Sequence, residues 1–172
     1  MFASFRKKPS DPGAAKVGNT ESTMFPTCYD HPRNPKLKLW DLPGMGTRKQ
    51  RAETYWTKME LDKFDAYLIF ASGRFTENDS KLADKVHSIG KTFFFVRAKI
   101  DVDLRNAAHD QGLTSFTDEQ EHKELLKIRK DCLENLKGVE RNLVDVYLIS
   151  NRSPDKWDFG RLTKAILQCD AL

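Results

Sequence analysis

Four short apolar segments, rich in β-branched and aromatic residues, recur along the chain. Each has the length of a β-strand, and its apolar character is nearly continuous, which is typical of parallel strands buried on both faces. The first of them alternates lysine with leucine, as a strand at the edge of a sheet does. The predicted strands are Lys36–Trp40, Ala66–Ala71, Thr92–Val96 and Val144–Ser150.

Stretches with helical spacing lie between and after these strands. Leu82, Val86 and Ile89, for example, stand three or four positions apart and so share one face of a helix. Alternating strands and helices, joined by crossovers of this length, predict an α/β fold: a mostly parallel sheet with helices on both faces. The predicted helices cover about Arg48–Met59, Thr76–Ile89, Thr117–Leu136 and Lys156–Leu167.

The start of the chain differs in kind from the rest. Met1–Thr27 contains three prolines and two glycines but few core-forming residues, which favours a loop or tail. Within it, Phe25–Tyr29 has the composition of one antiparallel edge strand. We therefore expect the regular fold to begin near the end of this segment.

Composition narrows the class of protein. A length of 172 residues fits one domain, and 39% hydrophobic with 31% charged residues fits a globular protein. No apolar run approaches the roughly 20 residues of a membrane span, and the first residues do not form a secretory signal, so we expect a cytoplasmic protein. The net charge of +4 comes from 29 basic and 25 acidic residues that are mixed along the chain, so nucleic acid is not an expected partner.

Candidate chemistry lies just beyond the strand ends, where ligands bind in open parallel sheets. Asp41 follows the first predicted strand and is followed by Leu42, Pro43 and Gly44. A carboxylate there suits Mg²⁺ held through water, and a glycine lets a backbone N–H approach a γ-phosphate. The alternative is a simple strand-ending turn, because Pro-Gly is a common turn pair.

Two further strand ends carry groups suited to guanine. Asp101 can accept from both N1–H and the exocyclic amine of guanine, while the stem of Lys99 lies along the purine face. Ser150 and Asn151 come directly after Ile149, at the end of the last predicted strand, where a backbone amide and small polar groups can meet the guanine carbonyl oxygen. An ordinary charge pair and an ordinary loop are the alternatives. The order and spacing of the three strand ends favour nucleotide recognition over coincidence.

At this point the chain resembles the interferon-inducible immunity-related GTPases, a p47-type, dynamin-like family. The resemblance runs from about Asp11 to the end of the chain, and its most specific piece is Trp40-Asp-Leu-Pro-Gly44. It implies a G domain of the P-loop NTPase type and GTP or GDP with Mg²⁺ as ligands. The matching stretches are Asp11–Gly18, His31–Gly46, Phe94–Asp101, Leu148–Asn151 and Trp157–Phe159.

Carried over residue by residue, the resemblance implies specific roles. Asp41 becomes the acid that holds Mg²⁺ through water, and Gly44 becomes the γ-phosphate sensor of the second switch. Thr20 and Thr23 lie where the family has its first switch, and either hydroxyl can reach the metal. The guanine-binding set is Lys99, Asp101, Ser150 and Asn151. Ala98 departs from the Thr or Asn usual in these GTPases and removes a side-chain tether of the neighbouring loops.

The larger departure from the family is that the 172 residues lack its phosphate-loop motif. No Gly-x-x-x-x-Gly-Lys-Ser/Thr phosphate loop occurs among them. We expect residues 1–10 to be a divergent tail and residues 11–172 to be a partial, N-terminally truncated G domain with impaired GTP hydrolysis. The resemblance places the chain in a family of GTP hydrolases and leaves open whether this chain is an active enzyme.

Two functional hypotheses follow. The first is the guanine-nucleotide-binding domain of an immunity-related GTPase, which assembles with copies or relatives through its nucleotide-binding face and lies peripherally on intracellular membranes, as the family does. The second is a nucleotide-free pseudo-GTPase that binds or regulates complete relatives. A fragment without function is the blander alternative.

Overall fold

The computed structural model describes residues 25–31, 34–44, 52–73, 76–136 and 144–169. These residues divide into two compact units, the first reaching Phe64 and the second beginning at Asp65. Each unit has its own sheet: one antiparallel pair of strands and one parallel sheet of three strands. Thr20 and Thr23, the candidates for the first switch, lie outside the described residues.

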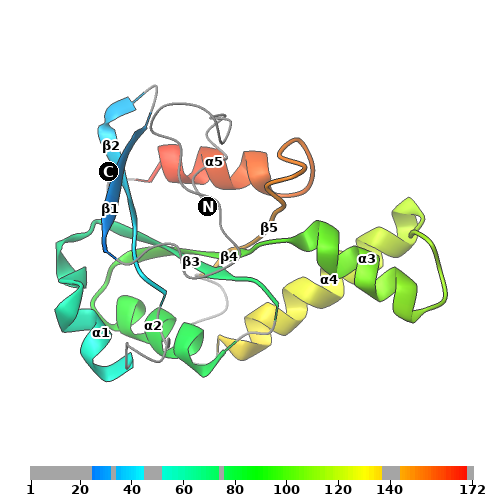
Figure 1. The fold of residues 1–172 in the computed structure, drawn as a ribbon, viewed down its shortest axis with the longest axis horizontal. Helices are drawn as coiled ribbons and strands as arrows, with labels where there is room; N and C mark the ends of the chain where they lie inside the picture. Colours follow the sequence, from blue (N-terminus) through cyan, green and yellow to red (C-terminus); the bar gives the residue numbers. More distant parts are fainter. Residues whose placement is uncertain (1–24, 32–33, 45–51, 74–75, 137–143, 170–172) are drawn as a thin grey trace. The chain divides into compact units, whose positions relative to one another are not determined.

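The first unit contains a β-hairpin followed by short helices (Figure 1). Strands β1 (Thr27–His31) and β2 (Asn34–Asp41) pair antiparallel, with Thr27 opposite Asp41. Nδ1 of the buried His31 accepts a hydrogen bond from the Asn34 N–H at 3.1 Å, which connects the end of β1 to the start of β2. After this hairpin come helix α1 (Ala52–Lys58) and a 3-10 turn, η2 (Leu61–Lys63).

Strand β2 corrects one expectation from the sequence. Leu37 and Leu39 are buried, whereas Lys36, Lys38 and Trp40 are exposed, so the strand is buried on one face only. Its partner in the described part of the chain is antiparallel, and the Lys-Leu alternation is the pattern that such a half-solvated strand requires. The expected edge strand near residues 25–29 exists as β1, shifted by two residues.

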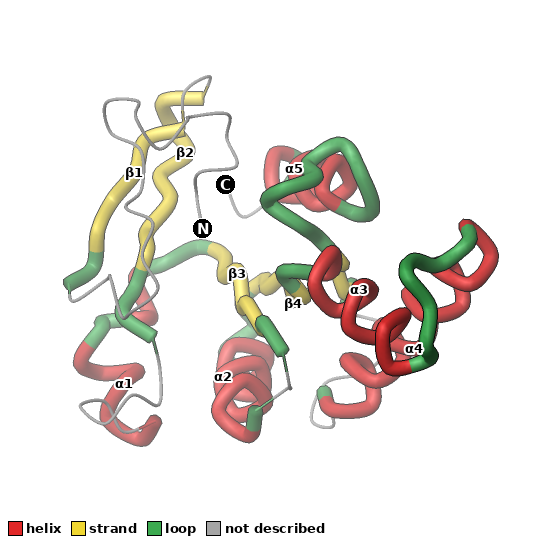
Figure 2. The backbone as a smooth tube through the Cα atoms, turned by 45° about the vertical axis from the view of Figure 1, so that its right-hand side comes forward, coloured by secondary structure: helices red, strands yellow, loops and turns green. Residues whose placement is uncertain are grey.

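The second unit contains the parallel sheet, in the order β3–β4–β5. Its strands are β3 (Ala66–Ala71), β4 (Thr92–Arg97) and β5 (Val146–Leu148). Helices α2 (Glu77–Ser88) and α5 (Phe159–Leu167) lie on opposite sides of β3 and β4, as Figures 1 and 2 both show. The α/β class with helices on both faces is thereby confirmed for this unit.

Helix α4 (Asp118–Asn135) and helix α2 begin where the sequence predicts. Thr76 and Thr117 are the N-cap residues, and each forms a reciprocal capping box with the third residue of its helix. Such a box satisfies two backbone donors that the first helical turn would otherwise leave unpaired. The core between helix and sheet is apolar: Val86 of α2 and both Phe95 and Val96 of β4 are fully buried.

Helix α3 (Ile100–Asp110) is the element that the sequence prediction misses. No helix is predicted from the sequence for the segment after Val96, which carries the candidate guanine-reading residues. Its apolar positions are Ile100, Leu104 and Ala108, which are spaced four apart and buried, so the helical signal is present but short. The last helix also begins later than expected, at Phe159, because Trp157 has a left-handed backbone conformation with φ of 52°.

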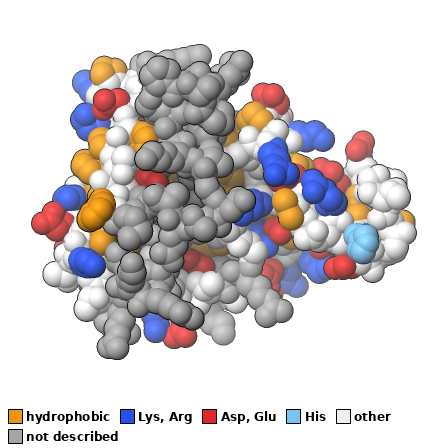
Figure 3. Space-filling view, in the orientation of Figure 1, with side chains coloured by type: hydrophobic (Ala, Val, Ile, Leu, Met, Phe, Trp, Pro, Cys, Tyr) orange, Lys and Arg blue, Asp and Glu red, His pale blue; other side chains and the backbone are white. Residues whose placement is uncertain are grey.

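Surface charges of both signs are interspersed on the face drawn in Figure 3, among the residues that are coloured there. None of the described helices is both long enough and apolar enough to cross a membrane.

Candidate functional site

The ends of β4 and β5 are joined by backbone hydrogen bonds that continue beyond the strands. Ile149 N–H donates to Arg97 O at 2.9 Å, and Ile100 N–H donates to Ile149 O at 3.1 Å. At the end of β3, Ala71 O accepts from Ala98 N–H at 2.9 Å. The carboxyl ends of all three parallel strands therefore meet at one edge of the sheet, which is where ligands bind in this architecture.

Lys99 and Asp101 stand at this edge, at the start of α3. Lys99 is the N-cap residue, with φ of 64° and ψ of 34°, a left-handed conformation that L-residues rarely adopt. This backbone turn separates the exposed Lys99 from the buried Ile100. A strained non-glycine residue at a strand end is typical of functional sites.

The Asp101 carboxylate lies in the first turn of α3, and its side chain is 15% exposed. The carboxylate therefore lies among the backbone N–H groups of the helix N-terminus, and an ionised carboxylate is a hydrogen-bond acceptor only. Nη2 of Arg105, one turn further along α3, lies 3.9 Å from Asp101 Oδ2. At that distance the pair is a weak surface contact that leaves acceptor capacity for a ligand.

Ser150 and Asn151 follow β5 at the same edge. Ser150 is 1% exposed, and its Oγ accepts a hydrogen bond from Arg152 N–H at 3.1 Å. Ser150 O also accepts from Ser153 N–H at 3.2 Å, so the loop turns sharply and exposes Asn151. Because Ile149 is hydrogen-bonded to both Arg97 and Ile100, the structure brings Ser150 and Asn151 next to the Lys99–Asp101 segment.

Asp41 and Gly44 belong to the first unit. Asp41 is the last residue of β2 and is half-buried, Pro43 is buried and Gly44 is exposed. The turn is anchored by Tyr55 of α1, whose hydroxyl donates to Pro43 O at 2.7 Å. Burial and the nearby Asp41 charge raise the pKa of Tyr55 to about 12, so the hydroxyl remains a donor at neutral pH. The expected meeting of Asp41 with Lys99 and Asp101 stays a prediction.

Comparison with known proteins decides the family. Residues 9–170 match the family model described as interferon-inducible GTPase (IIGP). This chain belongs to the interferon-inducible GTPase family. The predicted resemblance is thus confirmed, and the parallel unit is part of an interferon-inducible GTPase G domain.

Individual relatives show the extent of the match. The chain is 40% identical over 157 residues to T-cell-specific guanine nucleotide triphosphate-binding protein 2 of Mus musculus, covering 91% of this chain and 37% of the relative. It is 36% identical to Interferon-gamma-inducible GTPase 10 of Mus musculus, covering 90% and 36%. It is 37% identical to Interferon-inducible GTPase 5 of Rattus norvegicus, covering 88% and 32%. The chain therefore spans about a third of the length of these curated relatives.

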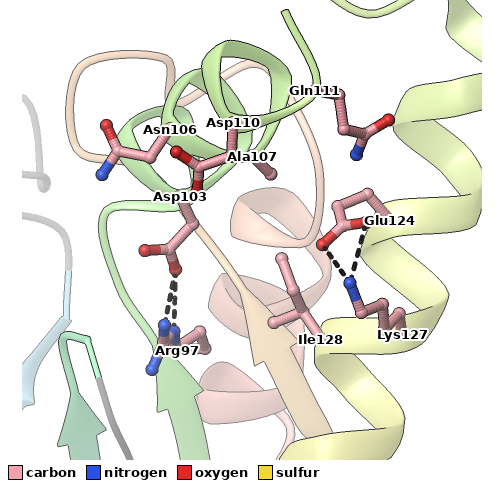
Figure 4. Close-up of a pocket in the computed structure, with 9 residues that line it drawn as sticks. All are labelled: Arg97, Asp103, Asn106, Ala107, Asp110, Gln111, Glu124, Lys127 and Ile128. Atoms are coloured by element: carbon pink, nitrogen blue, oxygen red, sulfur yellow. Dashed lines mark hydrogen bonds and ion pairs between the residues drawn. The ribbon is translucent and has the colours of Figure 1, made fainter.

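A polar pocket lies beside the sheet edge of this GTPase-family unit, between α3 and α4. It encloses about 480 Å³, and Figure 4 shows that its charged groups largely pair with one another. Arg97 contacts Asp103 Oδ2 through both Nε (2.9 Å) and Nη2 (2.8 Å), and Lys127 Nζ lies 3.2 Å from Glu124 Oε1. The Arg97–Asp103 pair connects β4 to α3 across the strained Lys99. The lining residues are Arg97, Asp103, Asn106, Ala107, Asp110, Gln111, Glu124, Lys127 and Ile128.

Sequence reasoning misses several residues that hold the site in place. Tyr55 and the Arg97–Asp103 pair are two examples, and Asp158, which hydrogen-bonds the backbone of β5, is the third. Asp158 belongs to the Trp157–Phe159 stretch that resembles the family, but two of its partners, Leu148 and Arg129, are 10 and 29 positions away along the chain. Pattern and spacing along the chain do not reveal such partners.

Proposed function

We propose that this chain is the guanine-reading part of the GTP-binding domain of an immunity-related GTPase. The observation that carries the proposal is the pair of backbone hydrogen bonds at Ile149, which holds the segment after β5 beside the segment after β4. Two loops with complementary groups for one purine are thereby placed at a single sheet edge. Relatives named as guanine nucleotide triphosphate-binding proteins add support.

In this proposal each residue has a separate task. Asp101 accepts hydrogen bonds from guanine N1–H and the exocyclic amine, a pairing that adenine cannot offer. The Lys99 stem covers the purine face, which suits its exposed position at the helix N-cap. Ser150 and Asn151 supply donors to the guanine carbonyl oxygen.

Asp41 and Gly44 are proposed for the phosphate end. A single carboxylate fits Mg²⁺, which typically keeps several waters and binds one or two carboxylates together with substrate phosphates. Among the described residues, no three His, Cys, Asp or Glu side chains are grouped so that they could hold a metal by themselves. The ion would therefore enter with the nucleotide, and bound there it would neutralise phosphate charge. Thr20 or Thr23 remains the proposed first-switch ligand.

The 172 residues contain no phosphate-loop motif, and this sets the expected affinity of the chain as it stands. A phosphate loop supplies charge-assisted hydrogen bonds worth about 1.5–3 kcal/mol each. Without three or four of them, binding weakens by roughly four powers of ten or more. We therefore propose that GTP hydrolysis by these residues alone is impaired.

Titration of the purified chain with a fluorescent guanine nucleotide tests the proposal. Guanine-selective binding, with an adenine nucleotide as control and with or without Mg²⁺, is the expected result. Asp101→Asn should weaken guanine binding by about 100-fold, because two charge-assisted bonds are lost. Asp110→Asn, at the exposed end of the same helix, is the matched control and should leave binding unchanged. Equal affinity for guanine and adenine would reject the proposal.

A second function is favoured by the retention of Asp41–Gly44 and Asp101 without a phosphate loop in the same residues. In this alternative the chain is a nucleotide-free pseudo-GTPase that binds full-length relatives through the surface around residues 41–51, of which 45–51 lie outside the described residues. Co-precipitation with a full-length relative, in both nucleotide states, tests it. No association in either state would reject it.

The family resemblance also supports wider proposals for the complete protein. These are a role in interferon-induced innate immunity, a cytoplasmic location with peripheral association with intracellular membranes, and assembly through the nucleotide-binding face.

A further inference from the structure

Asp158 connects helices α4 and α5 to β5, the strand that precedes the Ser150–Asn151 loop. Its Oδ2 accepts a hydrogen bond from Leu148 N–H at 2.9 Å, and its own N–H donates to Leu148 O at 3.0 Å. The same Oδ2 lies 2.6 Å from Arg129 Nη2 of α4, and Oδ1 accepts from Arg161 Nε of α5 at 3.1 Å. Both backbone groups of one strand residue are thus bonded to a single residue outside the sheet.

The two arginines reinforce the same edge of β5. Arg129 Nη1 donates to Val146 O, and Arg161 Nη2 donates to that oxygen at 2.9 Å. The Arg161 guanidinium also lies 4.3 Å from the centre of the Tyr147 ring. On this edge of β5, side chains therefore hydrogen-bond the backbone groups, as strand β4 does on the other edge. Asp158 is the side chain that both arginines contact.

Leu148 stands two residues before Ser150, and the residue between them is bonded to the other loop. Ile149 N–H donates to Arg97 O, and Ile149 O accepts from Ile100 N–H. A shift of Leu148 along the strand would break these bonds and move Ser150 and Asn151 away from Lys99 and Asp101. The side chain of Asp158 is only 16% exposed, so water does not readily replace its contacts.

We infer that Asp158, held by Arg129, is a positioning residue that sets the Ser150–Asn151 loop in register with the Lys99–Asp101 segment for recognition of the guanine carbonyl oxygen. Asp158 does not touch the base; it acts through Leu148 and Ile149. The inference rests on the proposed guanine site, and it assigns recognition of one part of the base, the carbonyl oxygen, to the position of the Ser150–Asn151 loop. Loosening Asp158 should impair reading of the carbonyl oxygen, while Asp101 still reads N1–H and the amine.

Hydrogen–deuterium exchange of the full 172-residue chain tests the structural half. Asp158→Ala should raise exchange in peptides covering 146–153 by about tenfold or more, because local opening then costs less. Peptides covering α2 should not change. Asp158→Asn, which keeps an acceptor for Leu148 N–H but loses the charge, should have a smaller effect. Asp145→Asn is the matched control, since Asp145 ion-pairs with the same Arg161 at 2.6 Å but is exposed.

Binding of two nucleotides tests the recognition half. GDP is compared with 6-thioguanosine diphosphate, in which sulfur, a weak acceptor, replaces the carbonyl oxygen while N1–H and the amine remain. The wild-type chain should prefer GDP by about tenfold, the value of one good hydrogen bond. Asp158→Ala should abolish this preference by weakening GDP alone. A purely structural role would weaken both nucleotides equally.

Each result decides a separate question. Unchanged exchange at 146–153 in Asp158→Ala, or an equal rise in the α2 peptides, would overturn the inference. An unchanged preference for GDP over the thio analogue would also overturn it. If the wild-type chain binds neither nucleotide, even at concentrations high enough to offset the missing phosphate-loop contacts, the proposed function fails. The exchange experiment still shows whether Asp158 holds the β5 end.

Discussion

The two units hold their candidate residues in different ways. In the second unit, the residues proposed to read the base are connected by a continuous backbone ladder, and their immediate neighbours Ile100 and Ile149 are at most 3% exposed. In the first unit, Asp41 ends a hairpin strand that is buried on one face, and the turn after it is anchored by Tyr55. The candidate residues of the second unit are thus built into a core, whereas Asp41 in the first unit is attached to a two-stranded hairpin.

This difference follows from the kind of sheet in each unit. Parallel strands are buried on both faces, so the register of their ends is fixed by packing as well as by hydrogen bonds. A two-stranded hairpin is only marginally stable by itself and depends on what packs against it. We therefore expect base recognition to depend on the second unit and metal and phosphate contacts to be the more easily lost.

The largest expected effect is on the free energy of unfolding, when a core side chain is truncated in each of the two units. Phe95→Ala in β4 removes a fully buried ring and should lower the free energy of unfolding by about 3–5 kcal/mol. Leu39→Ala in β2, where the side chain is 8% exposed, should cost about 2 kcal/mol, at the low end for a buried leucine. Urea denaturation followed by peptide-resolved hydrogen exchange assigns each loss to its unit. A larger loss from Leu39→Ala would reverse the comparison.

The next effect concerns the anchor of the Asp41 turn. Tyr55→Phe leaves the buried Pro43 carbonyl without its donor and should cost about 1–3 kcal/mol in the first unit. The pKa of Tyr55 is raised from 10.0 to about 12 by burial and by the charge of Asp41. The hydroxyl therefore contributes its full stability below pH 10, and this contribution is lost as the pH rises towards 12.

Alkaline denaturation of both proteins measures that contribution. Other tyrosines also titrate, so the informative quantity is the difference in unfolding free energy between wild type and Tyr55→Phe. The difference should shrink between pH 10 and pH 12. A constant difference would show that the Tyr55 hydroxyl does not support the turn.

Much of this architecture is accessible from the sequence. The strands at Ala66–Ala71 and Thr92–Arg97 are predicted within one residue, because long apolar runs leave few alternatives. The starts of α2 and α4 are also predictable, since Thr76 and Thr117 carry capping chemistry within four residues. Local rules therefore predict those elements whose causes are local.

The missed features are one short, polar helix and the contacts between distant segments. Helix α3 escapes prediction because its 11 residues carry many polar groups and follow a left-handed Lys99 that no sequence rule predicts. In the sequence, Asp158 stands out only as part of a motif, because its partners Leu148 and Arg129 come from another strand and another helix. The four base-site candidates lie beyond the ends of β4 and β5, with Asp101 in the first turn of α3. Their roles stay predictions.

A third prediction separates stability from function at Lys99. A left-handed conformation costs an L-residue about 1–2 kcal/mol, and glycine avoids this cost. Allowing for the greater freedom of glycine in the unfolded chain, Lys99→Gly should stabilise the second unit by about 1 kcal/mol. Guanine-nucleotide affinity should fall, because the stem that covers the purine is lost.

Lys99→Ala is the matched control for that experiment. It removes the same stem but keeps the Cβ and hence the strain. Both variants should lose nucleotide affinity to the same extent, while thermal unfolding should show a gain in stability for glycine alone. Equal stability of the two variants would show that the left-handed turn stores no strain.

The smallest expected effect appears in acid and concerns the second unit. Partial burial raises the pKa of Asp158, but hydrogen bonds from Leu148 N–H, Arg161 and Arg129 outweigh it, so the net pKa lies below the ordinary value of 3.8. Burial and the hydrogen bonds act on this pKa in opposite directions, and the pH dependence is expected to be small. The contribution of Asp158 is complete well above pH 3.8 and is lost as the pH falls through its lowered pKa. Acid unfolding of wild type and Asp158→Asn, followed by Trp157 fluorescence, measures this loss. The difference in stability between the two proteins should shrink towards lower pH. A difference in stability that grows towards lower pH would contradict a stabilising Asp158 carboxylate.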